Sequence, residues 1–164
     1  MQKCAALVRP CSDADLKKIH AIQLKCFQSA QWRLEDYQQL ARDPLGLILV
    51  AEDDAKLPQL AGFAAFHRVL DEAELRNMAV DPARQRKGIA RALLAAGIRS
   101  LQASGVSRLF LEVRASNIPA IAFYASDGFT VLHTRRDYYH NPAEDALVMA
   151  CTIATPPDFS SNQK

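Results

Sequence analysis

The chain has 164 residues, of which 49% are hydrophobic and 23% are charged, and its formal net charge is +2. This length suits one compact domain, which we expect to cover residues 1–154. The small net charge argues against binding nucleic acid through bulk charge. No apolar run reaches the ~18 residues of a membrane span, and the N-terminus lacks the apolar core of a signal peptide. We therefore expect a cytoplasmic protein with neither a nucleic-acid nor a membrane partner.

The N-terminal third predicts a strand followed by two helices. An apolar run predicts a strand over residues 4–9. A helix is expected from about residue 15 to 27, with Asp13 as its cap and with the candidate core positions Leu16, Ile19, Ile22 and Leu24. A shorter helix over residues 33–41 should end at Asp43-Pro44, because the residue before a proline is disfavoured in a helix.

The remaining elements predict a mixed sheet. Apolar runs bounded by turn formers predict three strands, at 45–53, 60–70 and 72–80. A helix over 88–104, a strand over 108–113, a helix capped by Asn117 that ends near 126, and strands at 129–136 and 144–153 follow. Short connections favour antiparallel pairs and the later β-α-β unit favours a parallel pair. We expect an α/β (α+β) fold with about seven strands, mostly antiparallel, and helices on both faces; residues 155–164 read as a disordered tail.

The four cysteines do not form a metal-binding pattern. They are Cys4, Cys11, Cys26 and Cys151; none belongs to a CxxC pair, and no histidine has the spacing of a zinc site. We expect free, partly buried thiols and no metal.

The segment VDPARQRKGIA places two cations and a glycine before a helix. The first N–H groups of a helix lack internal partners and carry partial positive charge. Arg86 and Lys87 can neutralise an anion, while the amides around Gly88 to Arg91 can bind its oxygens, an arrangement that suits a phosphate or pyrophosphate. The alternative is a solvated basic turn. The segment matches neither GxGxxG nor GxxxxGK[ST].

Glu112 interrupts the apolar strand RLFLEV, and Tyr124 lies on the helix that follows. A carboxylate on such a strand can accept a proton from an amine, and a phenol can donate one to a leaving group. The alternatives are an ion pair between Glu112 and Arg114 on the same face of the strand, and an ordinary core position for Tyr124.

Together these motifs resemble the GCN5-related N-acetyltransferase (GNAT) superfamily. NMAVDPARQRKGIARALL is similar to its acetyl-CoA loop, Q/R-x-x-G-x-G/A, through Gln85, Gly88 and Ala90. LEVRASNIPAIAFYASDGF, RRDYY and EDALVMA are similar to the pattern of the bacterial ribosomal-protein-alanine N-acetyltransferases (RimI type). The resemblance is strong from about Glu72 to Met149. Lys87 and Ala90 replace residues that are often glutamine and glycine, and a proline common before the tryptophan is missing before Trp32.

The resemblance implies an acetyl-CoA-dependent enzyme that acetylates the α-amine of a protein N-terminus, with an alanine-starting ribosomal protein as partner. It implies Glu112 as general base and Tyr124 as general acid, with Glu74 as the reserve base. The implied cofactor-binding residues are Met78, Ala79, Val80, Arg86, Lys87, Gly88, Ile89, Ala90, Arg91 and Asn117. The implied acceptor-binding residues are Trp32, Tyr138 and Tyr139. A lysine or small-amine acetyltransferase, or a non-catalytic acetyl-CoA-binding module, are the alternatives.

Overall fold

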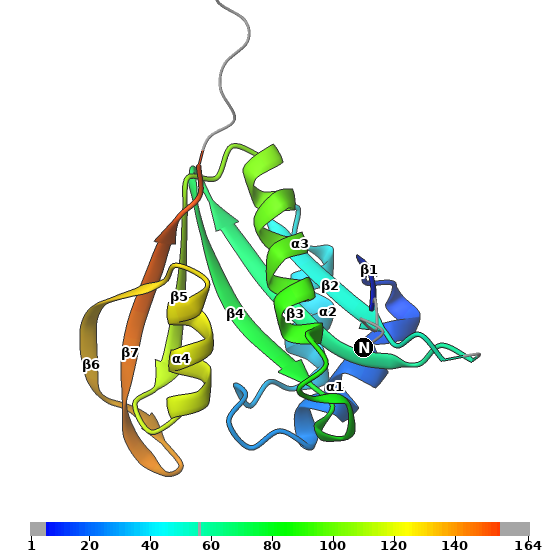
Figure 1. Cartoon of the computed structure of the whole chain (residues 1–164), viewed down its shortest axis with the longest axis horizontal. Coiled ribbons are helices and arrows are strands. Elements are labelled where there is room, and N and C mark those ends of the chain that lie inside the picture. Colours follow the sequence, from blue (N-terminus) through cyan, green and yellow to red (C-terminus); the bar gives the residue numbers. More distant parts are fainter. Residues whose placement is uncertain (1–5, 56, 155–164) are drawn as a thin grey trace, which may run out of the picture.

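The computed structural model of the chain describes residues 6–55 and 57–154 and contains one seven-stranded sheet (Figure 1). The strands are β1 (Leu7–Pro10), β2 (Gly46–Glu52), β3 (Leu60–Val69), β4 (Glu72–Val80), β5 (Arg108–Arg114), β6 (Thr130–His140) and β7 (Ala143–Thr152). The helices are α1 (Leu16–Leu24), α2 (Leu34–Arg42), α3 (Ile89–Ala103) and α4 (Ile118–Ser126), with short 3₁₀ turns η1 (Asp13–Asp15) and η2 (Pro82–Arg84). The predicted start of the first strand at Cys4 and the predicted tail lie outside the described residues.

The strand order is β1-β2-β3-β4-β5-β7-β6. Neighbouring strands run antiparallel, except that β4 and β5, which are joined through α3, run parallel. This agrees with the predicted mixture, because a crossover helix is what allows two neighbouring strands to run in the same direction. The β4–β5 pair therefore divides the sheet into two antiparallel parts.

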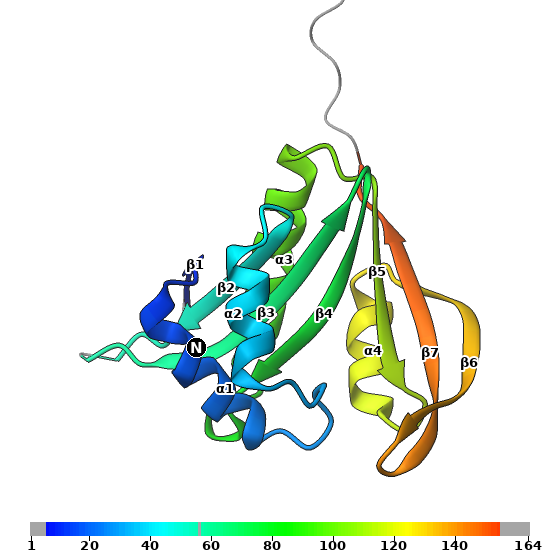
Figure 2. The ribbon, with the colours of Figure 1, turned by 180° about the vertical axis from the view of Figure 1, so that it is seen from behind.

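Helices cover both faces of the sheet, as predicted. α3 and α4 lie in front of the sheet in Figure 1, and α1 and α2 lie on the opposite face, which Figure 2 shows from behind. Each face has its own apolar core. Phe66, Leu93 and Leu111 belong to the core beneath α3 and α4, whereas Ile19 and Phe63 belong to the core beneath α1 and α2. In the described part of the chain, no helix is long and apolar enough to cross a membrane.

The predicted cap and the predicted C-terminal end of α1 are wrong, whereas its start at Leu16 lies one residue from the predicted position. Ser12, rather than Asp13, precedes the first turn, and its backbone N–H donates to the Asp15 carboxylate (2.8 Å). The helix ends at Leu24 instead of Phe27. Leu24 is consequently exposed, and the polar Gln23 occupies the buried position beside it. The periodic pattern could not reveal this because Leu24 and Gln23 are adjacent, and only tertiary contacts decide which of them faces the sheet.

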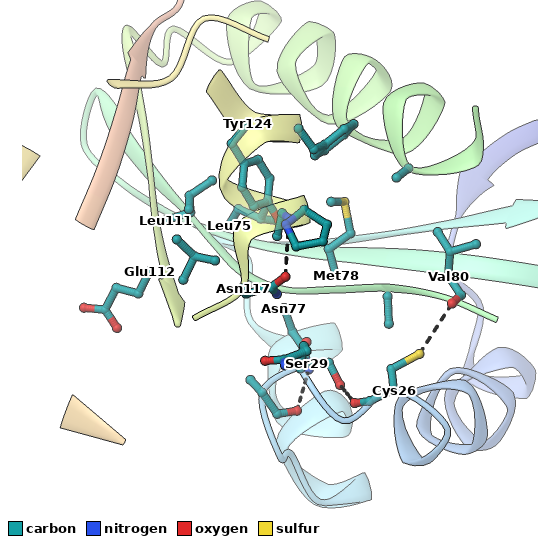
Figure 3. Close-up of a pocket in the computed structure, with 18 of the residues that line it drawn as sticks. Cys26, Ser29, Leu75, Asn77, Met78, Val80, Leu111, Glu112, Asn117 and Tyr124 are labelled. Carbon is teal, nitrogen blue, oxygen red and sulfur yellow. Dashed lines mark hydrogen bonds between the residues drawn. The ribbon is translucent and has the colours of Figure 1, made fainter. Parts of the chain in front are cut away.

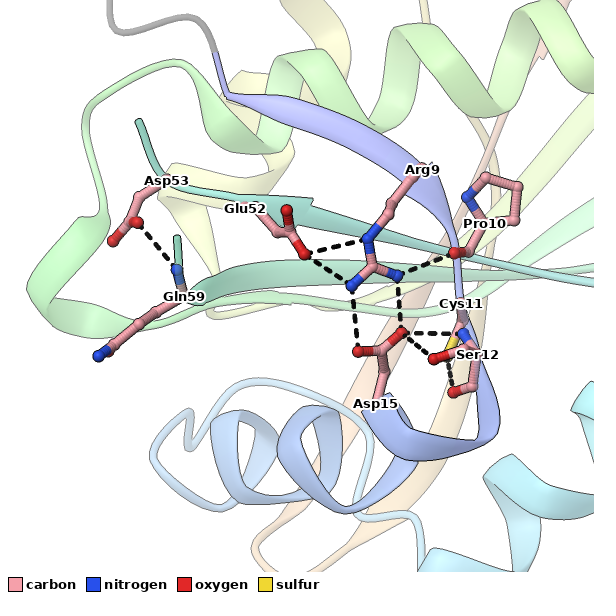
Figure 4. A network of polar contacts seen from close by, with 8 residues as sticks. All are labelled: Arg9, Pro10, Cys11, Ser12, Asp15, Glu52, Asp53 and Gln59. Carbon is pink, nitrogen blue, oxygen red and sulfur yellow. Dashed lines mark hydrogen bonds and ion pairs between the residues drawn. The ribbon is translucent and has the colours of Figure 1, made fainter. Parts of the chain in front are cut away.

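Arg9 ties β1 to β2 and to the start of α1 (Figure 4). Its guanidinium donates to Asp15 Oδ2 (2.7 Å) and Oδ1 (3.2 Å), and to Glu52 Oε1 through Nε (3.0 Å) and Nη2 (2.7 Å). Hydrogen bonding to Arg9 holds the pKa of the buried Asp15 carboxyl well below its usual range. A charge that is removed from water needs such partners, so this network anchors the N-terminal edge of the sheet.

The described cysteines are free thiols, as predicted. Cys11 and Cys26 are half-buried and Cys151 is buried. Burial raises the pKa of the Cys11 thiol to about 11 and also raises the pKa of Cys26. Both groups are therefore protonated near neutral pH, which disfavours a role for either as a nucleophile.

Candidate active site

The two halves of the sheet separate in the middle of the β4–β5 pair. The pairing runs from Glu72 opposite Arg108 to Leu75 opposite Leu111 and stops there. A bulge leaves Arg76 without an opposite residue on β3, and a bulge bends its strand and increases the twist. The diverging strands are visible in Figure 1, and a cavity of about 890 Å³ fills the space between them.

The part of β4 beyond the bulge has backbone groups that face this cavity. Val80 O accepts hydrogen bonds from Gln85 Nε2 (3.1 Å) and from the Cys26 thiol (3.4 Å), so this carbonyl is turned away from β3. Asp81 N, in contrast, donates to Ala61 O at the end of β3 (2.8 Å). Backbone groups alternate in direction along a strand, so the N–H of Met78 is turned away from β3, like Val80. A ligand in the cavity can therefore pair with this strand where β5 does not.

The cavity brings together nearly every residue that the sequence singled out. Its lining includes the predicted catalytic pair, the reserve base Glu74, the three aromatic acceptor-side residues and nine of the ten predicted cofactor residues: Met78, Ala79, Val80, Arg86, Gly88, Ile89, Ala90, Arg91 and Asn117. The exception is Lys87, which is exposed and is not part of the lining. Lys87 lies between the lining residues Arg86 and Gly88, so its charge is still close to the cavity.

The turn before α3 forms an open cradle of backbone amides. Gly88 precedes the helix with φ of 79°, and Arg86 has φ of 65°, both in the left-handed region. Ala92 is the first residue whose N–H donates within the helix, to Gly88 O (3.0 Å), so the preceding amides point outward. A Cβ added at Gly88 would meet nothing within 4 Å, which means that this side of the turn is open to a ligand.

Ion pairs hold this turn from outside the cavity. Arg84 pairs with Asp53 of the β2–β3 connection (2.8 Å), and Lys25 pairs with Asp81 (2.8 Å). The Arg91 side chain contacts Asp127 (3.3 Å) just beyond the end of α4. Its side chain therefore links α3 to α4, while its backbone N–H remains part of the cradle.

Asn117 caps α4 as predicted. Its side-chain oxygen accepts from Ala120 N (3.3 Å), a bond drawn in Figure 3, and Pro119 lies in the first turn, where a missing N–H costs little. With its oxygen used in the cap, the side chain has its NH₂ group left to donate to a ligand in the cavity.

Glu112 and Tyr124 belong to opposite faces of the sheet. Leu111 and Val113 are buried in the core beneath α3 and α4, so the intervening Glu112 faces the other way. Figure 3 shows Glu112 directed away from α4, the helix that carries Tyr124. Both residues line the same cavity. A group entering between the strands can therefore meet a carboxylate on one face and a phenol on the other.

The partner of Glu112 differs from the one that the sequence suggested. Its carboxylate is ion-paired with Arg135 of β6, whereas Arg114 pairs with Glu144 (3.2 Å). Arg114 lies two residues beyond Glu112 on β5, but each finds a nearer partner on another strand: Glu144 on β7 for Arg114, and Arg135 on β6 for Glu112. Two effects raise the pKa of Tyr138 to about 12: mainly its hydrogen bond to the Glu112 carboxylate, and secondarily its burial. Tyr138 is therefore a protonated donor beside this carboxylate.

Tyr124 is buried against an aromatic cluster. Its ring makes edge contacts with Phe123 (5.2 Å between centroids) and Phe129 (5.6 Å). Burial raises the pKa of its phenol above the ordinary value. The group consequently keeps its proton across the whole physiological range, as a proton donor must.

The three aromatic residues that were predicted to bind the acceptor lie on two separate segments. Trp32 precedes α2 and lies beneath the guanidinium of Arg76 (5.3 Å to the ring centroid). Tyr138 and Tyr139 are on β6, with their ring centroids 5.1 Å apart, and Arg114 lies 4.0 Å from the Tyr139 ring. Both segments line the cavity, together with Glu112.

Sequence reasoning missed Asn77, Arg76 and Gln23. Asn77 is a buried polar residue that lines the cavity, Arg76 is the bulged residue, and Gln23 is fully buried on α1. A polar residue within an apolar stretch was the available signal for Asn77 and Gln23. No local pattern marks the bulge at Arg76.

Comparison with known proteins identifies the fold and the family. The model of the acetyltransferase (GNAT) family matches residues 16–129. The crystal structure of the ribosomal-protein-S18-alanine N-acetyltransferase from Escherichia coli superposes with a TM-score of 0.81 at 35% identity, covering 94% of this chain and 97% of that one. The architecture described above is therefore the GNAT fold.

Two curated relatives support the same assignment. The [ribosomal protein bS18]-alanine N-acetyltransferase of Escherichia coli K12 is 51% identical over 98 residues, which span 58% of this chain and 66% of that relative. A putative [ribosomal protein bS18]-alanine N-acetyltransferase of Bacillus subtilis is 31% identical over 151 residues, which span 92% of this chain and 98% of that relative. The chain belongs to the GNAT acetyltransferase family.

Proposed function

We propose that the protein transfers the acetyl group of acetyl-CoA to the α-amine of a protein N-terminus, with an alanine-starting ribosomal protein as the acceptor. The observation that carries the proposal is the position of Glu112 and Tyr124 at one cavity but on opposite faces of the sheet. Relatives that are named as ribosomal-protein alanine N-acetyltransferases support the choice of acceptor.

The cavity fits acetyl-CoA in three respects. The outward amides before α3 and the exposed cations Arg86 and Lys87 suit a pyrophosphate. The outward backbone groups of Met78 and the outward N–H of Val80, where β5 no longer pairs with β4, suit the amide groups of the pantetheine arm, which can take the place of the missing strand. The NH₂ group of Asn117 adds a donor on the α4 side.

In the proposed reaction, Glu112 removes a proton from the α-ammonium, directly or through a water, and the amine attacks the thioester carbonyl. The outward N–H on β4 near Met78 stabilises the developing oxyanion. As the carbon–sulfur bond breaks, Tyr124 donates its proton to the thiolate. The attacking nitrogen releases its second surplus proton, which restores the Tyr124 phenol, and the proton held by Glu112 passes to solvent, so that the products are an acetamide and coenzyme A. Because the two substrates meet across the sheet, the fold holds them in line and supplies part of the rate.

The test combines cofactor binding with release of the coenzyme A thiol. We expect acetyl-CoA to bind in calorimetry, and thiol release to require a peptide with a free N-terminal alanine. The same peptide with its N-terminus blocked is the control. Thiol release with free lysine or small amines but not with the peptide would contradict the proposed acceptor, and binding without release on any amine would leave a cofactor-binding module.

A further inference from the structure

Gln23 on α1 is a fully buried polar side chain that does not line the cavity. An amide in such a place is costly unless its hydrogen bonds are made. Its Nε2 donates to Trp32 O (2.8 Å), and its Oε1 accepts from Trp32 N (3.3 Å) and Asn77 Nδ2 (3.1 Å). The Tyr37 hydroxyl also donates to this oxygen. Gln23 therefore forms hydrogen bonds with both the backbone N–H and the backbone carbonyl of Trp32.

The partners fix the orientation of both amides. If Gln23 were flipped, its NH₂ group would face the NH₂ group of Asn77 and the N–H of Trp32. If Asn77 were flipped, its oxygen would face two other acceptors, Gln23 Oε1 and Ala30 O, because its Nδ2 lies 3.2 Å from the latter. The Asn77 oxygen is consequently turned away from this network, and it is buried without a hydrogen-bonding partner among the described residues.

The network ends on the acceptor wall of the cavity. Ala30, Trp32 and Asn77 all line the cavity, and Figure 3 shows Asn77 reaching from β4 toward the segment that carries Ser29. This segment, between α1 and α2, contains neither helix nor strand, so no backbone ladder holds it in place. The Trp32 ring packs on Tyr37 with 5.0 Å between centroids. Asn77 holds this wall at Ala30 O (3.2 Å), and Gln23 connects it to α1 through both backbone groups of Trp32.

We propose that Gln23 is a positioning residue: it holds the Trp32 wall at the geometry that the acceptor amine requires, without contacting either substrate. The kinetic part of this inference rests on the proposed function, whereas the positional part does not. Its consequence is that a change at Gln23 weakens the use of the acceptor and leaves the use of acetyl-CoA intact, because the cofactor cradle before α3 lies on other elements.

The test is Gln23→Met, which keeps the length of the side chain and removes its hydrogen bonds. Gln39→Met, at an exposed position on α2, is the matched control. We expect Gln23→Met to raise the KM for the acceptor peptide about tenfold, with kcat and the KM for acetyl-CoA within about twofold of the wild type. An unchanged acceptor KM, or an equal rise in both KM values, would overturn the proposal.

Trp32 provides a readout that needs no turnover, because it is the single tryptophan of the chain. In Gln23→Met its emission should shift to the red and acrylamide should quench it more strongly, while Gln39→Met matches the wild type. If Gln23→Met does not fold, Tyr37→Phe removes the two hydrogen bonds of the Tyr37 hydroxyl, to Gln23 and from Asn77 (2.9 Å), and should show smaller changes in the same direction, because Gln23 keeps its bonds to Trp32. Unchanged fluorescence in a folded variant would overturn the proposal even if the protein acetylates no peptide; altered fluorescence without activity would count against the proposed function alone.

Discussion

Replacing Tyr124 by phenylalanine tests the proposed general acid with little disturbance of the fold. The substitution removes the phenolic oxygen and keeps the ring contacts with Phe123 and Phe129. General acid catalysis contributes roughly 10²–10⁴-fold. We expect the lower end, because a thiolate whose thiol has a pKa of ~8.5 leaves without full protonation. A fall of about 100-fold in kcat corresponds to about 2.7 kcal/mol in the activation free energy.

Steady-state kinetics at saturating peptide, with both KM values and the thermal midpoint measured in parallel, checks this expectation. Both KM values should stay within about twofold, since the ring still fills its site. Because burial raises the pKa of Tyr124, the wild-type kcat should not fall through loss of this proton between pH 7 and an ordinary tyrosine pKa of ~10. Tyr124→Phe with unchanged kcat would refute the acid role. A wild-type decline centred below pH 9 that is absent from the variant would refute the protonated state.

Three further predictions concern the base, the cofactor cradle and the N-terminal anchor. Glu112→Gln should lower kcat about 100-fold. Glu74 lines the same cavity, but Glu74→Gln should keep kcat within about threefold of the wild type. The reverse result in a pH–rate series would make Glu74 the base. Gly88→Ala should raise the KM for acetyl-CoA about tenfold, since it adds strain and a methyl group at the open side of the cradle. Gly105→Ala, with φ of 83° and equally open, is the control, and equal KM values in the two variants would contradict the cradle. Asp15→Asn should cost about 2–3 kcal/mol in the free energy of unfolding at pH 7, because it breaks a buried ion pair while Arg9 keeps Glu52. Arg9 lowers the pKa of Asp15 in the folded protein. The ion pair therefore contributes fully to stability above pH ~3.9, the ordinary pKa of Asp in the unfolded chain, and this contribution is lost as the pH falls through the lower folded pKa. Urea unfolding should therefore show the gap between wild type and variant closing toward pH 2, and a constant gap would contradict the linkage.

Local chemistry made much of the fold predictable. Asn117 and Pro119 mark the start of α4 because a cap and a first-turn proline act within a few residues. The β4–α3–β5 connection predicted the parallel pair because a helical crossover returns the chain to the end of the sheet at which the first strand began. The turn before α3 could be singled out as a candidate anion site because cations, a glycine and a helix start are consecutive in the sequence.

Contacts between distant segments were not predictable from the sequence. The bulge at Arg76 opens the sheet, yet nothing in the strand pattern marks it. Glu112 pairs with Arg135, 23 residues away, rather than with its neighbour Arg114, because register across three strands decides the contact. Gln23 and Asn77 are 54 residues apart, and their pairing depends on how α1 packs against β4.

One measurement tests the central claim most directly: mass-spectrometric localisation of the acetyl group on a single peptide that carries both a free N-terminal alanine and an internal lysine. The α-amine has a pKa of ~7.7–8.0 and the lysine amine ~10.4, so the two acceptors differ in both basicity and surroundings. The account predicts acetylation at the alanine α-amine alone, at a rate about 100-fold lower in Glu112→Gln. Acetylation of the lysine, or equal activity of Glu112→Gln at the α-amine, would contradict it.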